Sequence, residues 1–391
     1  MAEYIFVLGR TGDLCRWELV SVLARKKISY QTIFSSSDIF HLSTTTPLDL
    51  GVLMGILGGT VKIAEVFGKI ESSNENSLID KIISHFQETE ERKIIFGLSG
   101  YQNVSFHVLK QWNKSVKEGL EESNLIARYL LHTEGTTLSS VVLKKQKARE
   151  ILVVGEGENF VLAQTLAITD FEDWGKRDFG RPAVDPGHGM LPLKVARMMI
   201  NLGGSEFHVP NSELSLLDPF CGVGTILQEA MFLGFKVLGS DQSREALEKT
   251  RKNLDFLKNN FKLQNPNDQL FQLEATQLTQ KIPKESIDLI VTEPYLGPME
   301  GKTQNLKNII LGLEKLYLGC FREWLSLLTN DGKIVIALPS FKVGNQQIFV
   351  KKPIDICETL GYTLFAGPYP YSRPQARVIR NIYILKKHGS H

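Results

Sequence analysis

The segment that most constrains the fold of this chain is an apolar stretch that runs into a glycine-containing turn. Leu214–Leu217 is apolar, and residues 218–225 read Asp-Pro-Phe-Cys-Gly-Val-Gly-Thr. Helical spacing of apolar residues begins at Thr225, and Gly234 would end that helix. Glycine lets the backbone approach a ligand closely, and a helix N-terminus directs free N–H groups toward the same place. The pattern predicts a strand, a ligand-binding turn and a helix.

Strand-like and helix-like stretches continue to alternate up to the C-terminus. Further strands are predicted near residues 236–239, 270–273, 287–291 and 333–338. Helices are predicted from Ser243, over about 306–328 and near 354–360. Two late strands, at 362–365 and 378–385, are joined by a Pro-rich loop, which is typical of an antiparallel pair. Strands alternating with helices predict an α/β fold with a mostly parallel sheet covered on both faces.

Polar groups follow the first three of these strands. Asp241 lies at the tip of the second strand, 17 residues past Gly224, and Glu274 follows the third strand. A carboxylate at the second tip can accept both hydroxyls of a ribose, and the third tip can reach an adenine ring. The turn lacks the third glycine of a dinucleotide fingerprint, because position 227 is Leu. We therefore predict a nucleoside site made of Asp218, Pro219, Cys221, Gly222, Gly224, Thr225, Asp241, Gln242, Glu274 and Ala275.

The fourth predicted strand runs into Thr292, Glu293, Pro294 and Tyr295. An exocyclic amine is a poor nucleophile, because its lone pair is delocalised into the ring. A polar acceptor can hold the amine hydrogens while an aromatic ring stacks on the extruded base, and proline keeps such a loop rigid. Either Thr292 or Glu293 can supply the acceptor, and Tyr295 can stack. A turn with a structural tyrosine is the alternative interpretation.

These motifs carry a resemblance to a known family. DPFCGVGT at 218–225, GSD at 239–241 and EAT at 274–276 resemble motifs I, II and III of class I methyltransferases, in the branch that methylates exocyclic amines. The resemblance implies S-adenosylmethionine as the cofactor and a Rossmann-like, seven-stranded sheet whose last strand is antiparallel. That branch has Asp or Asn followed by Pro-Pro-Tyr in its catalytic loop. Here Thr292 stands at the first position and Glu293 replaces the first proline.

The segment before the first strand extends the resemblance. Residues 181–196, from Arg-Pro to Val-Ala, resemble motif X, which in the family covers the methionine end of the cofactor. This implies that Met190, Leu191 and Pro192 also bind the cofactor. An interdomain linker followed by a packing helix is the alternative.

The N-terminal half reads as small α+β modules. A helix is predicted over Leu14–Arg25, and strands are predicted at 4–8, 61–66, 93–98 and 139–143. The stretches YIFVLGRTGDLCRWELVSVL, LGGTVKIAEV, SSVVLKKQKAREILVV and ITDFEDWGKRD resemble the N-terminal half of the tRNA guanine methyltransferases that modify position ten. The resemblance implies a ferredoxin-like module over 1–68, a THUMP-like RNA-binding domain over 69–170, a connector over 171–210 and a methyltransferase domain over 211–391.

Bulk charge does not indicate a nucleic-acid partner. The net charge is +2, and residues 1–170 hold 18 Lys or Arg against 20 Asp or Glu. A local basic cluster of Lys144, Lys145, Lys147 and Arg149 could contact several phosphates. A solvated surface is the alternative interpretation.

The four cysteines are far apart and form no CxxC pair, so we expect reduced thiols and no metal site. No apolar stretch is long enough for a membrane span, and the N-terminus lacks a signal-peptide pattern. We therefore expect a cytoplasmic protein. A monomer is our expectation, and the sequence leaves the oligomeric state open. The leading hypothesis is methylation of a guanosine N2 amine in tRNA. Adenine N6 methylation of DNA or another RNA, and RNA binding with a decayed catalytic loop, remain open, as does mono- against dimethylation.

Overall fold

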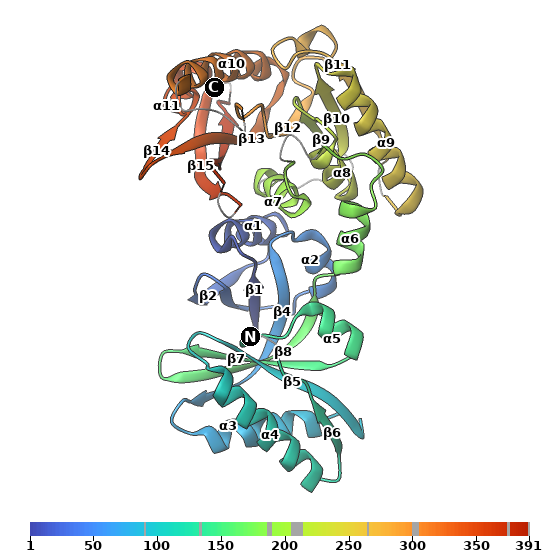
Figure 1. Cartoon of the computed structure of the whole chain (residues 1–391), viewed down its shortest axis with the longest axis vertical. Coiled ribbons are helices and arrows are strands. Elements are labelled where there is room, and N and C mark those ends of the chain that lie inside the picture. Colours follow the sequence, from blue (N-terminus) through green and yellow to red (C-terminus); the bar gives the residue numbers. More distant parts are fainter. Residues whose placement is uncertain are drawn as a thin grey trace. The chain divides into compact units, whose positions relative to one another are not determined.

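The computed structural model describes residues 1–89, 91–132, 135–185, 190–204, 214–263, 266–298, 305–373 and 376–389. The chain divides into two compact units (Figure 1). The first unit comprises residues 1–12, 28–56 and 60–174, and the second comprises residues 13–27, 57–59 and 175–391.

The first unit is built on one sheet of eight described strands, in the order β2-β3-β1-β4-β8-β7-β5-β6. Helices α3 and α4 pack on each other and on this sheet, around Phe96 and Trp112. The elements are β1 (Ala2–Leu8), β2 (Tyr30–Ser35), β3 (Ile39–Thr44), α2 (Leu50–Ile56), β4 (Thr60–Glu71), α3 (Glu75–Gln87), β5 (Lys93–Tyr101), α4 (Phe106–Glu122), β6 (Ile126–Tyr129), α5 (Ser140–Gln146), β7 (Arg149–Glu156) and β8 (Asn159–Ile168).

One strand prediction in this unit is wrong. Residues 139–143 were predicted to be a strand, but α5 covers Ser140–Gln146. The Ser139 hydroxyl accepts a hydrogen bond from the Val142 N–H at 3.3 Å and thereby caps the helix. This local cap outweighs the strand preference of the two adjacent valines.

The next helix, α6 (Phe171–Phe179), lies at the start of the predicted connector over 171–210. The Asp170 carboxylate caps it by accepting the N–H groups of Glu172 and Asp173, both at 3.2 Å.

The second unit holds the predicted α/β sheet. Its strand order is β11-β10-β9-β12-β13-β16-β15, and β14 pairs with β13. The first five strands of this order run parallel, and β16 is antiparallel to both of its neighbours. The strands are β9 (Ser215–Asp218), β10 (Lys236–Asp241), β11 (Asp268–Gln272), β12 (Ile287–Thr292), β13 (Leu328–Val343), β14 (Gln346–Phe349), β15 (Tyr362–Tyr371) and β16 (Val378–Lys387). The Rossmann-like α/β prediction is confirmed, and β14 is an additional strand.

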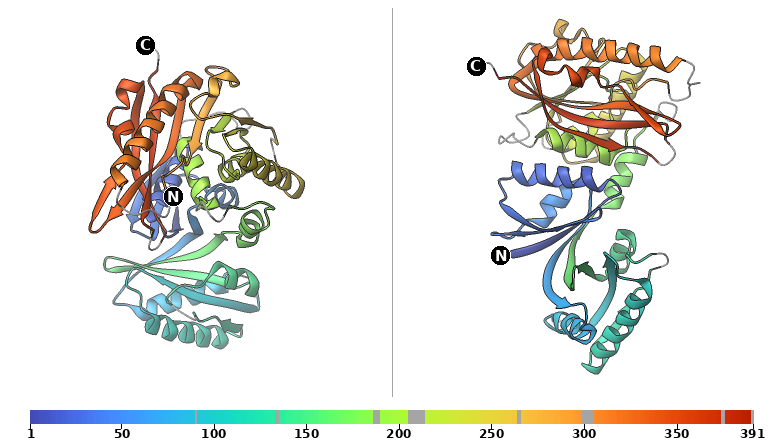
Figure 2. Two further views of the ribbon diagram at one scale, coloured as in Figure 1. Left: turned by 45° about the horizontal axis from the view of Figure 1, so that its top comes forward. Right: turned by 90° about the vertical axis from the view of Figure 1, so that its left-hand side faces the viewer.

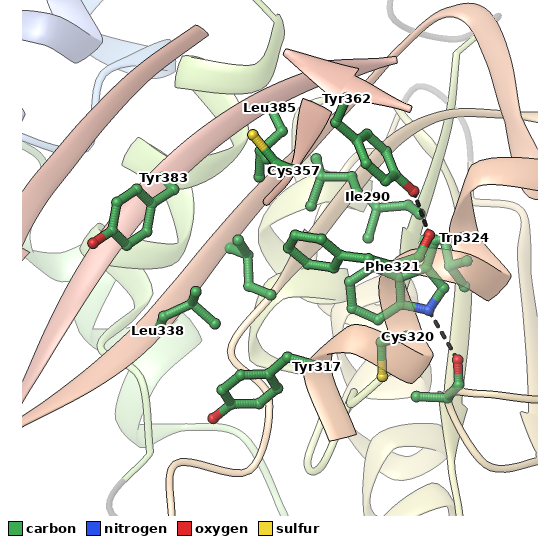
Figure 3. Close-up of a cluster of buried hydrophobic side chains, with 14 of the residues drawn as sticks. Ile290, Tyr317, Cys320, Phe321, Trp324, Leu338, Cys357, Tyr362, Tyr383 and Leu385 are labelled. Atoms are coloured by element: carbon green, nitrogen blue, oxygen red, sulfur yellow. Dashed lines mark hydrogen bonds between the residues drawn. The ribbon is translucent and has the colours of Figure 1, made fainter. Parts of the chain in front are cut away.

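Helices cover both faces of this sheet. Figure 2 shows α7 and α10 on opposite faces. The helices are α7 (Leu193–Gly203), α8 (Thr225–Phe232), α9 (Arg244–Asn260), α10 (Leu306–Leu327) and α11 (Lys352–Asp355). Between α10 and the strands lies a buried apolar core that contains Phe321 and Trp324 (Figure 3). In this core the Trp324 indole N–H donates to the Ala275 carbonyl at 2.9 Å, which fixes the segment after β11.

A helix from the N-terminal end of the chain belongs to this second unit. Helix α1 (Gly12–Arg25) contributes Glu18, whose carboxylate is fully buried. It accepts the N–H groups of Gly58 and Gly59 at 2.8 and 2.7 Å and the Asn201 amide at 2.7 Å. Burial raises the pKa of Glu18, and these hydrogen bonds partly oppose that rise. The acid therefore ties α1 to α7 within one compact unit.

No helix among the described residues is long and apolar enough to cross a membrane.

Candidate functional site

A cavity of about 560 Å³ lies where four neighbouring strands of the second unit end. Asp218 ends β9, Asp241 ends β10, Glu274 follows β11, and Glu293 follows β12. Parallel strands place their carboxyl ends at one edge of a sheet, where ligands bind in open α/β folds. The lining residues include most of the predicted set: Asp218, Pro219, Cys221, Gly222, Thr225, Asp241, Gln242, Glu274, Ala275, Met190, Leu191, Glu293, Pro294 and Tyr295.

The turn after β9 has the backbone that its glycines allow. Gly222 and Gly224 have φ of +53° and +84°, which disfavours other residues. Apart from its chain neighbours, no described residue has an atom within 4 Å of the position that a Cβ on Gly222 would occupy, so this glycine leaves open space beside the turn. Gly224 does not line the cavity; it precedes α8 and packs against Thr250. Gly222 thus leaves room for a ligand at the cavity, whereas Gly224 allows the turn to pack closely against Thr250.

Asp241 is bound to the same turn. One carboxylate oxygen accepts the Gly222 N–H at 3.0 Å, and the other accepts the Ser243 N–H at 2.9 Å. Each oxygen keeps further lone pairs, because an ionised carboxylate can accept about four hydrogen bonds. The acid is therefore held in place and can still receive the two hydroxyls of a ribose.

Asp218 is a buried acid at the base of the cavity. It accepts the Phe220 N–H at 3.1 Å and the Thr292 hydroxyl at 2.8 Å. Burial raises the pKa of this carboxyl from 3.8 to about 7, and the nearby acids Asp241 and Glu293 add to the rise against the two hydrogen bonds. Asp218 therefore changes its charge state near neutral pH.

The structure separates the two candidates for the amine acceptor. Thr292 is fully buried, does not line the cavity, and donates its hydroxyl to Asp218. It is not placed to contact a substrate. Glu293 lines the cavity. The side chain that can accept amine hydrogens here is therefore Glu293.

Glu293 forms a two-bonded ion pair with Arg380 of β16. Arg380 Nε donates to one carboxylate oxygen, and Nη2 donates to the other at 3.0 Å. Arg380 is 4% exposed. Burial lowers its pKa, but the hydrogen bonds and charge of Glu293 more than offset this, so the pKa lies above its ordinary value. The two hydrogen bonds from Arg380 fix the direction of the Glu293 carboxylate.

Sequence reasoning missed Arg380. The signal that could have found it is a lone arginine inside the apolar strand VIRNIYIL. A charged side chain in such a strand needs a partner, and the partner lies 87 residues away.

Tyr295 lies at the cavity with its side chain 57% exposed. Its carbonyl accepts the Tyr317 hydroxyl of α10 at 2.6 Å, and burial raises the pKa of Tyr317 well above its ordinary value. The loop backbone is thus anchored to a buried, neutral phenol while the Tyr295 ring remains accessible. This is the arrangement that stacking on a base requires.

The motif X segment closes another side of the cavity. Met190 and Leu191 line it, whereas Pro192 precedes α7 and does not. Gly189 lies outside the described residues. Arg373, which follows β15, donates to the Met190 carbonyl at 2.9 Å. The sequence did not single out Arg373.

The predicted RNA-binding cluster is divided by its contacts. Lys144 binds the carboxylates of Asp170 and Glu172 at 2.9 and 3.2 Å. Arg149 donates to Thr89 and Gln164 and lies over the Phe86 ring. Lys145 and Lys147 are exposed, and among the described residues neither has a carboxylate within ion-pair distance. The proposed phosphate contact of this cluster therefore depends on these two lysines.

Known proteins resemble this chain both in sequence and in fold. Residues 210–360 match the model of a family described as "Methyltransferase domain". The solved structure of TrmN from Thermus thermophilus resembles the whole chain with a TM-score of 0.57 at 15% identity, covering 98% of this chain and 99% of that one. The second unit has a methyltransferase fold. A second solved structure, SMU.472 in complex with SAH, has a TM-score of 0.53 at 13% identity, covering 100% of this chain and 99% of that one.

The curated relatives are RNA methyltransferases by name. The tRNA (guanine(10)-N2)-dimethyltransferase of Methanothermobacter thermautotrophicus is 32% identical over 185 residues, which is 47% of this chain and 48% of that relative. The protein of the same name from Pyrococcus abyssi is 26% identical over 213 residues, 54% of this chain and 52% of that one. This chain thus spans about half the length of the curated relatives it matches. The resemblance to tRNA guanine-N2 methyltransferases is confirmed, and with the methyltransferase domain comes S-adenosylmethionine as the cofactor.

Replacing Asp241 by Ala should weaken S-adenosylmethionine binding by about 1.5–3 kcal/mol, because it removes hydrogen bonds between a carboxylate and the ribose. Titration calorimetry on the folded variant measures this loss. Glu245→Ala is the matched control, since Glu245 is an exposed acid that does not line the cavity. An Asp241 variant with parental affinity would remove this residue from the cofactor site.

Proposed function

We propose that this chain transfers a methyl group from S-adenosylmethionine to the exocyclic N2 amine of a guanosine in tRNA. The observation that carries the proposal is a carboxylate, Glu293, held by Arg380 beside an accessible ring, Tyr295, in the cavity of a methyltransferase fold. The names of the curated relatives support tRNA as the substrate and guanine N2 as the acceptor.

The described residues fit the cofactor. Asp241 would bind the ribose hydroxyls, the Glu274–Ala275 segment would contact the adenine, and Asp218 would bind the cationic amino acid end; all of them line the cavity. The open space at Gly222 allows the ligand to approach the turn, and Met190 closes the cavity from another side. When bound, S-adenosylmethionine supplies the methyl group as an electrophilic sulfonium. The cavity volume lies within the usual range of about 300–1,000 Å³ for small-molecule sites.

Glu293 favours guanine over adenine on chemical grounds. The base-pairing edge of guanine offers two neighbouring donors, N1–H and the N2 amine, whereas adenine offers its N6 amine beside an acceptor nitrogen. An ionised carboxylate can only accept hydrogen bonds, and the bonds from Arg380 leave lone pairs on both oxygens. The adenine acceptor would face these oxygens without a proton between them. A guanine amine is therefore the better match.

Tyr295 would hold the extruded base by stacking, which is worth about 1–3 kcal/mol per base. Pro294 limits the freedom of the loop between the two functional side chains. Arg380 acts through Glu293 and is a positioning residue.

The first unit would bind the tRNA. We retain its interpretation as a ferredoxin-like module over 1–68 and a THUMP-like domain over 69–170, with Lys145 and Lys147 as exposed phosphate contacts. The connector over 171–210 and the methyltransferase domain over 211–391 complete the proposed organisation. A monomer acting in the cytoplasm remains our expectation.

The proposal is tested by incubating the purified chain with labelled S-adenosylmethionine and tRNA, ribosomal RNA or DNA, and by identifying the labelled nucleoside after digestion. We expect N2-methylated guanosine from tRNA, and its mono- and dimethyl forms separate in the same analysis. Label in N6-methyladenine would contradict the guanine assignment. Cofactor binding without methylation of any nucleic acid would favour a non-catalytic RNA-binding protein.

A further inference from the structure

The positive charge of this chain is concentrated at its C-terminal end. Residues 332–391 contain nine Lys or Arg and only two acids, Asp355 and Glu358, although the whole chain has a net charge of +2. This segment contributes the end strands β14, β15 and β16 and most of β13 (Figure 1). An excess of one sign on one part of a fold creates a local field that the overall charge conceals.

Several of these cations have carboxylate partners. Arg380 pairs with Glu293, Lys386 with Asp331, Lys387 with Glu285, and Lys351 with Asp355. Lys352 is exposed at the start of α11. Lys342, Arg373 and Arg377 are also exposed and have no carboxylate within ion-pair distance in the described part of the chain. We refer to Lys342, Arg373 and Arg377 as the basic rim.

The basic rim lies at the edge of the sheet that holds the cavity. Strand β13 runs parallel to β12 and continues past its end, and a Cβ on Gly297 of the catalytic loop would lie 3.4 Å from the Phe341 ring. Lys342 follows Phe341, and its N–H donates to the Arg377 carbonyl at 2.9 Å. Arg373 binds the cavity residue Met190.

Arg377 directly precedes β16, the strand whose Arg380 binds the cavity residue Glu293. It lies three residues before Arg380, whose side chain holds Glu293. The basic rim and the proposed amine acceptor therefore share one edge of the sheet. A polyanion that delivers a base to Tyr295 would pass this edge.

We propose that the basic rim binds the phosphodiester backbone of the RNA on either side of the methylated nucleotide. The inference rests on the proposed function. Extruding a nucleotide swings its flanking phosphates toward the enzyme surface, and fixed cations beside the catalytic loop hold them there. The chemistry is that of RNA phosphates, because a base that must reach Tyr295 carries its own phosphates to the same place. The rim adds a second RNA contact, on the methyltransferase domain itself, to that proposed for the first unit.

The test is the salt dependence of tRNA binding by Lys342→Ala/Arg377→Ala. The slope of log affinity against log salt should fall by about two, because each lost phosphate contact lowers it by roughly one. Charge reversal at both positions should weaken tRNA binding by about tenfold or more at moderate salt. The control is Lys281→Ala/Lys284→Ala, which removes the same charge from exposed positions just before β12, at the opposite edge of the sheet. Its slope should match that of the parent.

Affinity for S-adenosylmethionine should be parental in both double variants, which shows that the domain is intact. An unchanged slope in the rim variant, with a parent that methylates tRNA, would overturn the inference and leave the proposed function standing. A parent that methylates no tRNA would contradict the proposed function itself. A rim variant that keeps parental tRNA binding but loses binding to vesicles containing anionic lipid would also overturn the inference, because the rim would then recognise a membrane surface.

Discussion

Glu293→Gln is expected to slow methyl transfer in a single turnover by about 100-fold, with tRNA and cofactor saturating. Positive charge develops on the amine as the methyl group arrives, and the carboxylate of Glu293 lies at the cavity to stabilise it. Loss of one preorganised electrostatic group of this kind costs about 10²–10³ in rate. Glutamine keeps an acceptor oxygen but removes the charge, so the variant separates stabilisation of charge from mere orientation. Rapid-quench measurement with labelled cofactor gives the rate.

The Glu293→Gln substitution also disturbs Arg380, so a second variant is needed as a control for the lost ion pair. The glutamine NH₂ would face an Arg380 N–H, and breaking a buried pair from one side costs about 3–5 kcal/mol. Arg380→Gln breaks the same pair but keeps the carboxylate. That variant should lose less rate than Glu293→Gln, because it keeps the negative charge proposed to stabilise the methylated amine. Thermal unfolding and cofactor affinity show whether each variant is folded.

Two results would remove Glu293 from the reaction. One is parental methylation by a folded Glu293→Gln. The other is equal slowing in both single variants, since that outcome reports only the lost ion pair. Tyr295→Ala tests the loop independently of Glu293. This variant should raise the barrier to methyl transfer by the stacking energy of about 1–3 kcal/mol and leave the pH profile unchanged.

The position of the turn and of the acid that line the cavity was predictable because the signals for both are local. The turn from Asp218 to Thr225 lies between a strand and a helix, and glycines mark where the backbone must turn. The acid at the next strand tip, Asp241, follows from the spacing of successive elements. Both predictions use only neighbours in sequence, and the structure places both at the cavity.

The catalytic side depends on pairings that no local pattern contains. Thr292 and Glu293 are adjacent, and the sequence could not choose between them. In the structure Thr292 donates its hydroxyl to Asp218, and the Glu293 carboxylate accepts a hydrogen bond from Arg380, which supports our proposal that Glu293 is the acceptor. Both partners are more than 70 residues away and arrive through strand order. The same limit applies to α1, since its buried Glu18 finds its partners only in the folded second unit.

Asp218 supplies the second large effect, because folding moves the pKa of its carboxyl from an acidic value to one near neutral pH. In the ligand-free chain, burial holds the pKa of this carboxyl at about 7 instead of 3.8. A carboxyl with a raised pKa leaves stability intact below pH 4. Stability is then lost as the pH rises through 7, because ionisation of the buried group is unfavourable. A tenfold change in an ionisation constant is worth about 1.4 kcal/mol, so the loss of stability is on the order of 4 kcal/mol.

Asp218→Asn should therefore raise the unfolding free energy of the ligand-free chain at pH 8 and change it little at pH 4, as measured by denaturant unfolding at both values. The asparagine oxygen can still accept the hydrogen bonds from Thr292 and Phe220.

S-adenosylmethionine should have the opposite preference, because its ammonium group favours the ionised form of Asp218. Its affinity for the parent should rise as the pH passes through 7, with proton release on binding, whereas the asparagine variant should bind more weakly and without this dependence. Thr292→Val removes a hydrogen bond that lowers the pKa of Asp218, and it should move the midpoint of the pH dependence upward. Calorimetry in buffers of different ionisation enthalpy measures the released proton, and a pH-independent affinity in the parent would show that Asp218 keeps one charge state throughout.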